Sequence, residues 1–316
     1  MLGIDVGKTA LSYSLLDASG QQLLAQGTVP NTTTGHAQLL ATIPPEHVWV
    51  LEPTGRYGDA LAAAGQAAGR TVVQAHPRHA QAFLRAIHPR AKTDRLDSLG
   101  LAQYALALPL RPYRRKSPLV EQVQQLLAAR RGLSQSLMRL RQQQHELPLA
   151  AATLTATRTS LRTHLRTLDR ELAELVKHSQ LAADVARLDA IPGVGPVTAT
   201  AVAACLHHKP FARADQFVAY VGLDVQVRQS GQRQGQAHLR HQGDAELRRL
   251  LYCCAQASLR SRAAPNPFRA QYERERAKGL PSTAALCVVA RKLARTCWSL
   301  VAHQATYDPQ RVGRQG

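Results

Sequence analysis

The stretch LGIDVGK at residues 2–8, followed by ALSYSLL at residues 10–16, decides the fold of the amino-terminal half. Both runs are short, apolar and rich in residues that favour strands, and a third run at residues 22–29 follows a turn at residues 17–20. These segments predict a meander of three strands. Asp5 lies within the first strand, where a charged residue is out of place unless it has a function.

Elements of two kinds alternate after the meander. Residues 47–51 predict a buried strand that ends at Glu52, and an Ala-rich helix follows at about residues 58–68. A further strand is expected at residues 70–74, with helices at residues 77–87 and 94–108. A meander followed by such alternation favours a mixed sheet with helices on its faces. We therefore expect an α/β domain over residues 1–116.

The pattern changes to helices in the second half of the chain. Apolar residues at 4-3 spacing over residues 117–180, interrupted by Arg130, predict an antiparallel helical hairpin or coiled coil. Its role as a spacer, a dimerisation arm or a nucleic-acid contact is left open. Residues 181–302 predict a mainly helical domain, and residues 303–316 predict a tail.

A possible phosphate-binding turn opens this helical domain. The stretch IPGVGP at residues 191–196, between two predicted helices, is typical of a helix-hairpin-helix. Its glycines, Gly193 and Gly195, are expected to present backbone N–H groups to a phosphate at a helix start. The alternative is a plain helical turn.

The charge of the chain points to a polyanionic partner. Its 316 residues carry 40 Lys and Arg against 21 Asp and Glu, a formal net charge of +19. Such an excess is typical of proteins that bind phosphate backbones. Aromatic residues make up only 4%, which disfavours a stacking platform for single strands.

Cellular location and redox state follow from what the sequence contains. It shows no signal peptide and no apolar run of about 18 residues, so we expect a cytoplasmic protein without a membrane partner. The five cysteines form no C-x-x-C pair, which indicates neither a zinc knuckle nor a disulfide framework.

Four carboxylates are the candidate metal ligands: Asp5, Glu52, Asp94 and Asp97. If the strands that carry Asp5 and Glu52 are neighbours, both side chains emerge at one edge of the sheet. Asp94 and Asp97 are three residues apart on a predicted helix and share a face. Each alone has an ordinary explanation as a turn residue or a helix cap. Together they predict an oxygen cage for Mg²⁺ or Mn²⁺ that could grip a scissile phosphate.

Three amino-terminal motifs carry a family resemblance. GIDVGK at residues 3–8, EPTGRY at residues 52–57 and KTDRLD at residues 92–97 resemble the motifs of the DEDD transposases of the IS110 (IS1111-like) insertion sequences. The resemblance continues in FVAYVGL at residues 217–223, in Ser230-Gly231 and in GDAELRRLL at residues 243–251. It implies an RNase H-like, RuvC-like domain, a central coiled coil and a mainly α transposase domain.

The resemblance also implies a nucleophile. Taken alone, Ser230-Gly231 reads as a turn in a polar loop, where Arg228 and Arg233 could hold a phosphate. By resemblance, Ser230 attacks the scissile DNA phosphate and forms a covalent link, and the metal held by the carboxylates is expected to activate it. The sequence departs from the family pattern at Val225, where a proline is usual, and at His241, where a lysine is common.

Partners follow from the same resemblance. It implies DNA at the element ends and target, a structured guide RNA that pairs with that DNA, and a homodimer or homotetramer. Two rival interpretations remain at this point. One is a RuvC-like, metal-dependent, structure-specific nuclease that does not need Ser230. The other is a catalytically silent nucleic-acid-binding protein.

Overall fold

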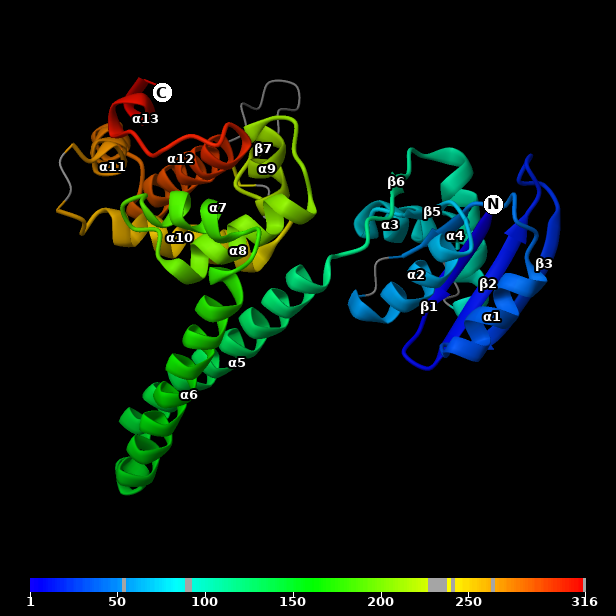
Figure 1. Cartoon of the computed structure of the whole chain (residues 1–316), viewed down its shortest axis with the longest axis horizontal. Helices are drawn as coiled ribbons and strands as arrows, with labels where there is room; N and C mark the ends of the chain where they lie inside the picture. Colours follow the sequence, from blue (N-terminus) through cyan, green and yellow to red (C-terminus); the bar gives the residue numbers. More distant parts are fainter. Residues whose placement is uncertain (53–54, 89–92, 227–237, 240–241, 263–264, 315–316) are drawn as a thin grey trace. The chain divides into compact units, whose positions relative to one another are not determined.

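The computed structural model describes residues 1–52, 55–88, 93–226, 238–239, 242–262 and 265–314. The chain divides into two compact units, Met1–Arg115 and Lys116–Gly316, and each is described by itself (Figure 1). Within the described ranges, no helix is both long enough and apolar enough to cross a membrane.

The first unit is built on a mixed sheet of six strands in the order β3-β2-β1-β4-β5-β6. Central β1 pairs antiparallel with β2 and parallel with β4, which in turn pairs parallel with β5. This order is that of an RNase H-like sheet and confirms the expected fold class. The strands are β1 (Leu2–Val6), β2 (Ala10–Leu16), β3 (Leu23–Pro30), β4 (Trp49–Leu51), β5 (Val72–Gln74) and β6 (Arg111–Pro112).

Helices cover both faces of this sheet. Helices α1 (Thr33–Thr42) and α2 (Asp59–Ala67), the latter after a 3-10 turn at Gly55–Gly58, pack on the face that buries Leu2 and Ile4. Helices α3 (Pro77–Ile87) and α4 (Asp94–Ala107) pack on the opposite face, over Val50 and Val73. The sequence pattern did not predict α1, because Thr and Gly in its first turn have low helix propensity.

Gly3 allows α4 to lie directly on β1. A Cβ atom at Gly3 would come 2.1 Å from the Ser98 carbonyl oxygen and 2.5 Å from the Ala102 nitrogen. The Ser98 hydroxyl also hydrogen-bonds the Ser14 hydroxyl of β2 at 2.8 Å, and both residues are buried. Any larger residue at position 3 would lift α4 off the sheet.

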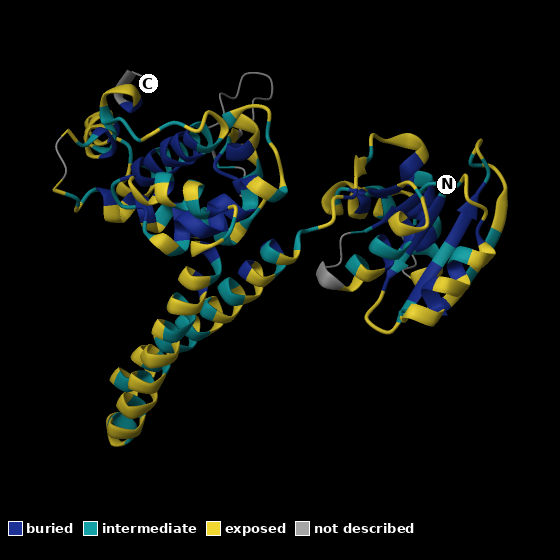
Figure 2. Cartoon of the chain, viewed as in Figure 1, coloured by how far each residue is buried: buried dark blue, intermediate teal, exposed yellow. Residues whose placement is uncertain are grey.

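The second unit begins with a long helical hairpin. Helices α5 (Pro118–Glu146) and α6 (Ala151–Lys177) are joined by a 3-10 turn at Pro148–Ala150 and pack along each other (Figure 1). Most of the hairpin is exposed or half-buried (Figure 2). Only the end nearest the helical body contributes to the core, through Val123, Leu172 and Val176. The interrupting Arg130 forms an ion pair with Asp169 across the hairpin at 2.5 Å.

The helical body packs around α12 (Ser282–Ala302), which contributes much of its buried core (Figure 2). A two-stranded ladder of β7 (Val225–Gln226) and β8 (His238–Leu239) joins it. The tail predicted for residues 303–316 is partly wrong, because Val312 in α13 is buried against this core. The remaining helices are α7 (Ala182–Asp189), α8 (Pro196–His208), α9 (Ala214–Val221), α10 (Ala245–Ser258), α11 (Pro267–Ala277) and α13 (Pro309–Arg314).

Candidate active site

The strand register places Asp5 and Glu52 on one face of the sheet. In β1, Gly3 faces α4, and Asp5 two residues later points to the same side. Gly3 pairs with Val50 and Ile4 with Leu51, so the next pair along the two strands is Asp5 with Glu52. Both carboxylates are half-buried, and both take part in polar interactions.

Asp94 and Asp97 lie in the first turn of α4, on the same face of the sheet. The helix begins at Thr93, whose hydroxyl accepts a hydrogen bond from the Leu96 N–H at 3.3 Å. Asp94 is exposed and Asp97 is half-buried. The four candidate carboxylates therefore belong to two neighbouring strands and to the helix that packs across one of them.

A divalent metal would suit the chemistry of these donors, since Mg²⁺ and Mn²⁺ prefer carboxylate oxygens. Within the described residues, however, no three His, Cys, Asp or Glu side chains are close enough together to hold a metal ion. The carboxylates share a face without forming a closed set of ligands. Their role as metal ligands stays a prediction.

The proposed nucleophile Ser230 and its neighbours Arg228 and Arg233 lie outside the described residues. What the structure describes is the base from which that segment starts and to which it returns. The ladder pairs Val225 with Leu239 and Gln226 with His238, the described residues on either side of residues 227–237.

Two glycines close this base. Gly243 has a φ of +117°, and a Cβ atom there would come 2.0 Å from the Tyr220 carbonyl oxygen. Gly222 ends α9 in the left-handed region, and a Cβ atom there would come 2.2 Å from the Gln242 carbonyl oxygen. The two backbone segments therefore touch in a way that only glycine permits. We call this contact the glycine clasp.

Polar groups of α10 hold the clasp in place. The Asp244 N–H donates to the Tyr220 carbonyl at 2.9 Å, and the Asp244 carboxylate caps α10 by accepting from the Glu246 and Leu247 N–H groups at 3.0 Å. The Arg248 guanidinium donates to the Val221 carbonyl at 3.0 Å. Sequence reasoning did not identify Arg248, because an Arg–carbonyl contact leaves no spacing signal.

Helices α7 and α8 flank the turn of the predicted helix-hairpin-helix, and Gly193 in this turn packs against the protein. A Cβ atom at Gly193 would come 2.5 Å from the Ser258 nitrogen at the end of α10. The Gly195 N–H hydrogen-bonds the Cys254 thiol, whose pKa is raised by burial. Gly193 therefore has a packing role, whereas a Cβ atom at Gly195 would meet no atom within 4 Å, and phosphate binding by the two glycines stays a prediction.

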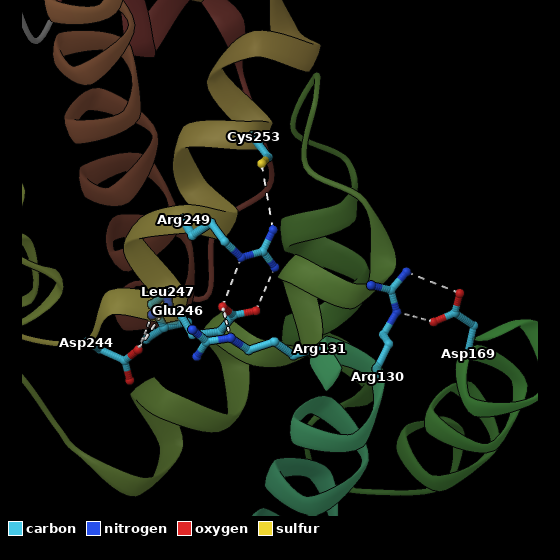
Figure 3. A network of polar contacts seen from close by, with 8 residues as sticks. All are labelled: Arg130, Arg131, Asp169, Asp244, Glu246, Leu247, Arg249 and Cys253. Carbon is cyan, nitrogen blue, oxygen red and sulfur yellow. Dashed lines mark hydrogen bonds and ion pairs between the residues drawn. The ribbon is translucent and has the colours of Figure 1, made fainter. Parts of the chain in front are cut away.

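A chain of ion pairs ties α5 to α10 close to the clasp (Figure 3). Glu246 accepts from Arg249 at 2.6 Å and forms an ion pair with Arg131 of α5 at 3.2 Å. The hydrogen bond from Arg249, and then the nearby charges of Arg249 and Arg131, hold the pKa of the Glu246 carboxyl below its usual value. The hairpin is therefore anchored one turn away from Asp244.

Two family models match this chain. One, described as a transposase of the DEDD IS110 type, matches residues 2–148. The other, described as a transposase of the IS116/IS110/IS902 family, matches residues 185–273. Together they cover about three quarters of the 316 residues.

Curated relatives agree with these models. A probable family 20 transposase from Pseudomonas aeruginosa is 30% identical over 148 residues, which are 45% of this chain and 44% of that protein. An uncharacterised protein of insertion element IS116 from Streptomyces clavuligerus is 28% identical over 142 residues, 45% of this chain and 34% of that protein. The matches thus span less than half the length of these two relatives. A pilin gene-inverting protein from Moraxella lacunata is 23% identical over 97% of both chains.

Among solved structures, that of T. thermophilus RuvC in complex with a Holliday junction substrate is similar to this chain. The match covers 36% of this chain and 99% of the RuvC chain. The sequence identity is 20% and the TM-score is 0.28.

Proposed function

We propose, since the chain belongs to the IS110 family of transposases, that it is the DNA transposase or site-specific recombinase of an insertion sequence. It cleaves and exchanges DNA strands at element ends and target by transesterification. The observation that carries this proposal is the placement of Asp5, Glu52, Asp94 and Asp97 on one face of the RNase H-like sheet.

The carboxylates would act through a divalent metal. Asp5 lies in β1, Glu52 directly follows the neighbouring strand β4, and Asp94 and Asp97 lie in the helix on the same face. We propose that these side chains move together when they bind Mg²⁺ or Mn²⁺ through their carboxylate oxygens. When bound, the metal supplies charge that stabilises a phosphate under attack. The carboxylates themselves set where that charge lies, at the edge where β1 and β4 end.

Ser230 would be the nucleophile in this reaction. Its hydroxyl oxygen bonds to phosphorus, the 3′ or 5′ oxygen of the broken strand leaves with a proton, and the phosphodiester energy is kept in the protein–DNA link for rejoining. The glycine clasp supports this role, because it fixes the two ends of the segment that carries Ser230 to α9 and α10. Arg228 and Arg233 are proposed to hold the phosphate.

The partners of the reaction are also proposals. The net charge of +19 supports DNA, and it would equally suit a structured guide RNA that selects the target by base pairing. The exposed hairpin of α5 and α6 is a candidate contact for a homodimer or homotetramer. We expect the reaction to take place in the cytoplasm.

Trapping of a covalent protein–DNA species tests this function. The parent protein with Mg²⁺ should give the adduct, and Ser230→Ala should abolish it while DNA binding is unchanged. Ser160→Ala is a matched control, because it makes the same substitution at an exposed serine of α6 that has no proposed role. An undiminished adduct in Ser230→Ala would contradict the proposed nucleophile. Cleavage without any adduct in the parent would favour the metal-only nuclease.

A further inference from the structure

Helix α3 presents a basic outer face on the same side of the sheet as the candidate carboxylates. We propose that this face, with Arg78 and Arg85 at its centre, contacts the phosphate backbone of duplex DNA that is held at the site. The inference rests on the proposed function and adds a DNA-contacting surface to it. Four observations support it: local charge, unpartnered arginines, position and the burial of the helix's apolar side.

The sequence around α3 carries positively charged residues and no acidic ones. Residues 60–93 contain no Asp or Glu, the longest such stretch in the chain, and they include five Arg or Lys residues and three histidines. Helix α3 lies in the middle of this stretch, at Pro77–Ile87. A region of one charge sign raises the local concentration of an oppositely charged ligand.

The two arginines of α3 are available to a ligand. Arg78 and Arg85 are seven residues apart, so they lie on one side of the helix, and both are exposed. In the part of the chain that the structure describes, neither makes a hydrogen bond or an ion pair. Arg70, by contrast, is occupied inside the unit, where it donates to the Leu40 and Ile43 carbonyls at 2.9 and 2.8 Å.

The start of α3 is close to the candidate carboxylates along the sheet. Leu51 of β4 pairs with Gln74 of β5, so the row that contains Asp5 and Glu52 continues to Ala75. Helix α3 begins two residues later. Since strands lie about 4.8 Å apart, Ala75 is about 10 Å from Asp5 along that row. Arg78 lies in the first turn of α3, at this end of the sheet, and Arg85 lies about 10 Å further along the helix axis.

The apolar side of α3 is already buried, which disfavours a membrane as its partner. Ala80 packs in the core, Phe83 meets the Tyr104 ring edge-on, and Leu84 lies over Gly100 of α4, where a Cβ atom would come 2.1 Å from it. An interfacial helix would need that side free to enter the lipid. The exposed residues of α3 include Arg78, His79, Gln81 and Arg85, which suit phosphate groups, and Ile87 at its end is the one large apolar side chain of the helix that is exposed.

Salt-dependent binding of duplex DNA tests this surface. The full chain is titrated with a duplex of an element end, without divalent metal, at several salt concentrations. Each phosphate contact contributes about 0.9 to the slope of log K against log salt. Arg78→Gln with Arg85→Gln should lower the steepness of that slope by about 1.8 and leave the melting temperature unchanged. Arg78→Lys with Arg85→Lys should restore most of the slope.

Two controls separate a specific contact from bulk charge. Arg260→Gln with Arg262→Gln removes the same charge from exposed residues of the other unit, and Gln81→Ala changes α3 without altering its charge. The inference predicts a smaller change for the first control and none for the second. An equal loss from the Arg260 and Arg262 pair would overturn it, because only net charge would then matter.

The failures of the two proposals are distinguishable. A parent protein that binds duplex DNA, together with an unchanged slope in the α3 double variant, overturns the inference alone. A parent protein that gives neither cleavage nor a covalent adduct with Mg²⁺ would contradict the proposed function, whatever the α3 variants show. A slope change seen with RNA and absent with duplex DNA would assign α3 to an RNA and overturn the contact proposed here.

Discussion

Both units bring backbone segments together through glycine, but at places of different kinds. At Gly3 the contact lies inside the sheet unit, between β1 and the α4 backbone, and fixes the helix that carries Asp94 and Asp97. At Gly243 the contact lies between α9 and the residue before the cap of α10, on either side of the stretch that includes Ser230. The first contact positions side chains on regular elements. The second positions the described residues on either side of the stretch with Ser230.

The difference shows that the two sets of candidate residues depend on different features of the fold. The carboxylates are placed by strand register and helix packing, so their positions depend on the core of the first unit. The described residues on either side of Ser230, the proposed nucleophile, are held by contacts to backbone groups around α9 and α10. We therefore expect changes in the first unit to act on stability and metal binding, and changes at the glycine clasp to act on the covalent step.

The largest expected effect is on catalysis in the sheet unit. Asp5→Asn keeps the shape of the side chain but removes its charge, and a metal ligand contributes several kcal/mol, so cleavage should fall by about 10³-fold or more. Asp17→Asn is the control, because Asp17 lies in an exposed turn. Cleavage rates are measured with saturating duplex DNA. A loss under tenfold for Asp5→Asn would remove this residue from the metal site.

The next effect is on the stability of the sheet unit. Gly3→Ala places a Cβ atom 2.1 Å from a backbone oxygen that cannot move away easily, so we expect a loss of about 3 kcal/mol in the free energy of unfolding. Urea denaturation measures it. Gly132→Ala in α5 meets no atom within 4 Å and should stabilise by about 0.5–1 kcal/mol. Equal effects of the two changes would show that α4 does not press on Gly3.

A smaller loss of stability is expected at the glycine clasp. Gly243→Ala combines a strained φ with a contact 2.0 Å from the Tyr220 carbonyl oxygen, and should cost about 2 kcal/mol. A second measurement, the yield of the covalent DNA adduct, separates the effect on Ser230 from the effect on stability. Yield of the covalent DNA adduct should fall in Gly243→Ala and stay intact in Gly132→Ala, with both proteins assayed well below their melting temperatures. An unaffected adduct yield would show that the clasp does not position Ser230.

The smallest effect is expected at the ion pairs of Figure 3. Arg131 and Glu246 are partly exposed, so a double-mutant cycle with Arg131→Gln and Glu246→Gln should give a coupling energy of about 0.5 kcal/mol. The folded-state pKa of Glu246 lies below its unfolded value of 4.5, so this stabilisation is present above pH 4.5 and is lost as pH falls through the folded pKa. A coupling that grows on acidification would contradict the ion pair.

The strands of the sheet unit were predictable from the sequence because they are short apolar runs separated by turn residues. Apolar runs at residues 2–6 and 10–16 identified two strands with their bounds, and a charged Asp5 within such a run marked a functional candidate. The short strand β6 and helix α1 were not predicted. Both are made of residues with weak intrinsic preference, and packing on the sheet decides their structure.

The helical unit was less predictable at its candidate site. The α5–α6 hairpin followed from its 4-3 spacing, whereas the clasp depends on residues that are 23 positions apart, Gly243 and Tyr220. No local pattern signals such a contact. Contacts of Gly193 and Gly195 with α10 were also not predictable from local sequence. The sequence suggested that both present free N–H groups, whereas Gly193 lies against Ser258 and the Gly195 N–H hydrogen-bonds Cys254.

The central claim is that Asp5, Glu52, Asp94 and Asp97 bind one metal centre on the α4 face of the sheet. A crystal of the full chain soaked with Mn²⁺ tests it most directly through anomalous difference density. The account predicts a peak about 2.2 Å from oxygens of Asp5 and Glu52, with Asp94 or Asp97 completing the ligands, and its loss in Asp5→Asn. Density that is absent there, or that persists in Asp5→Asn, would contradict the account.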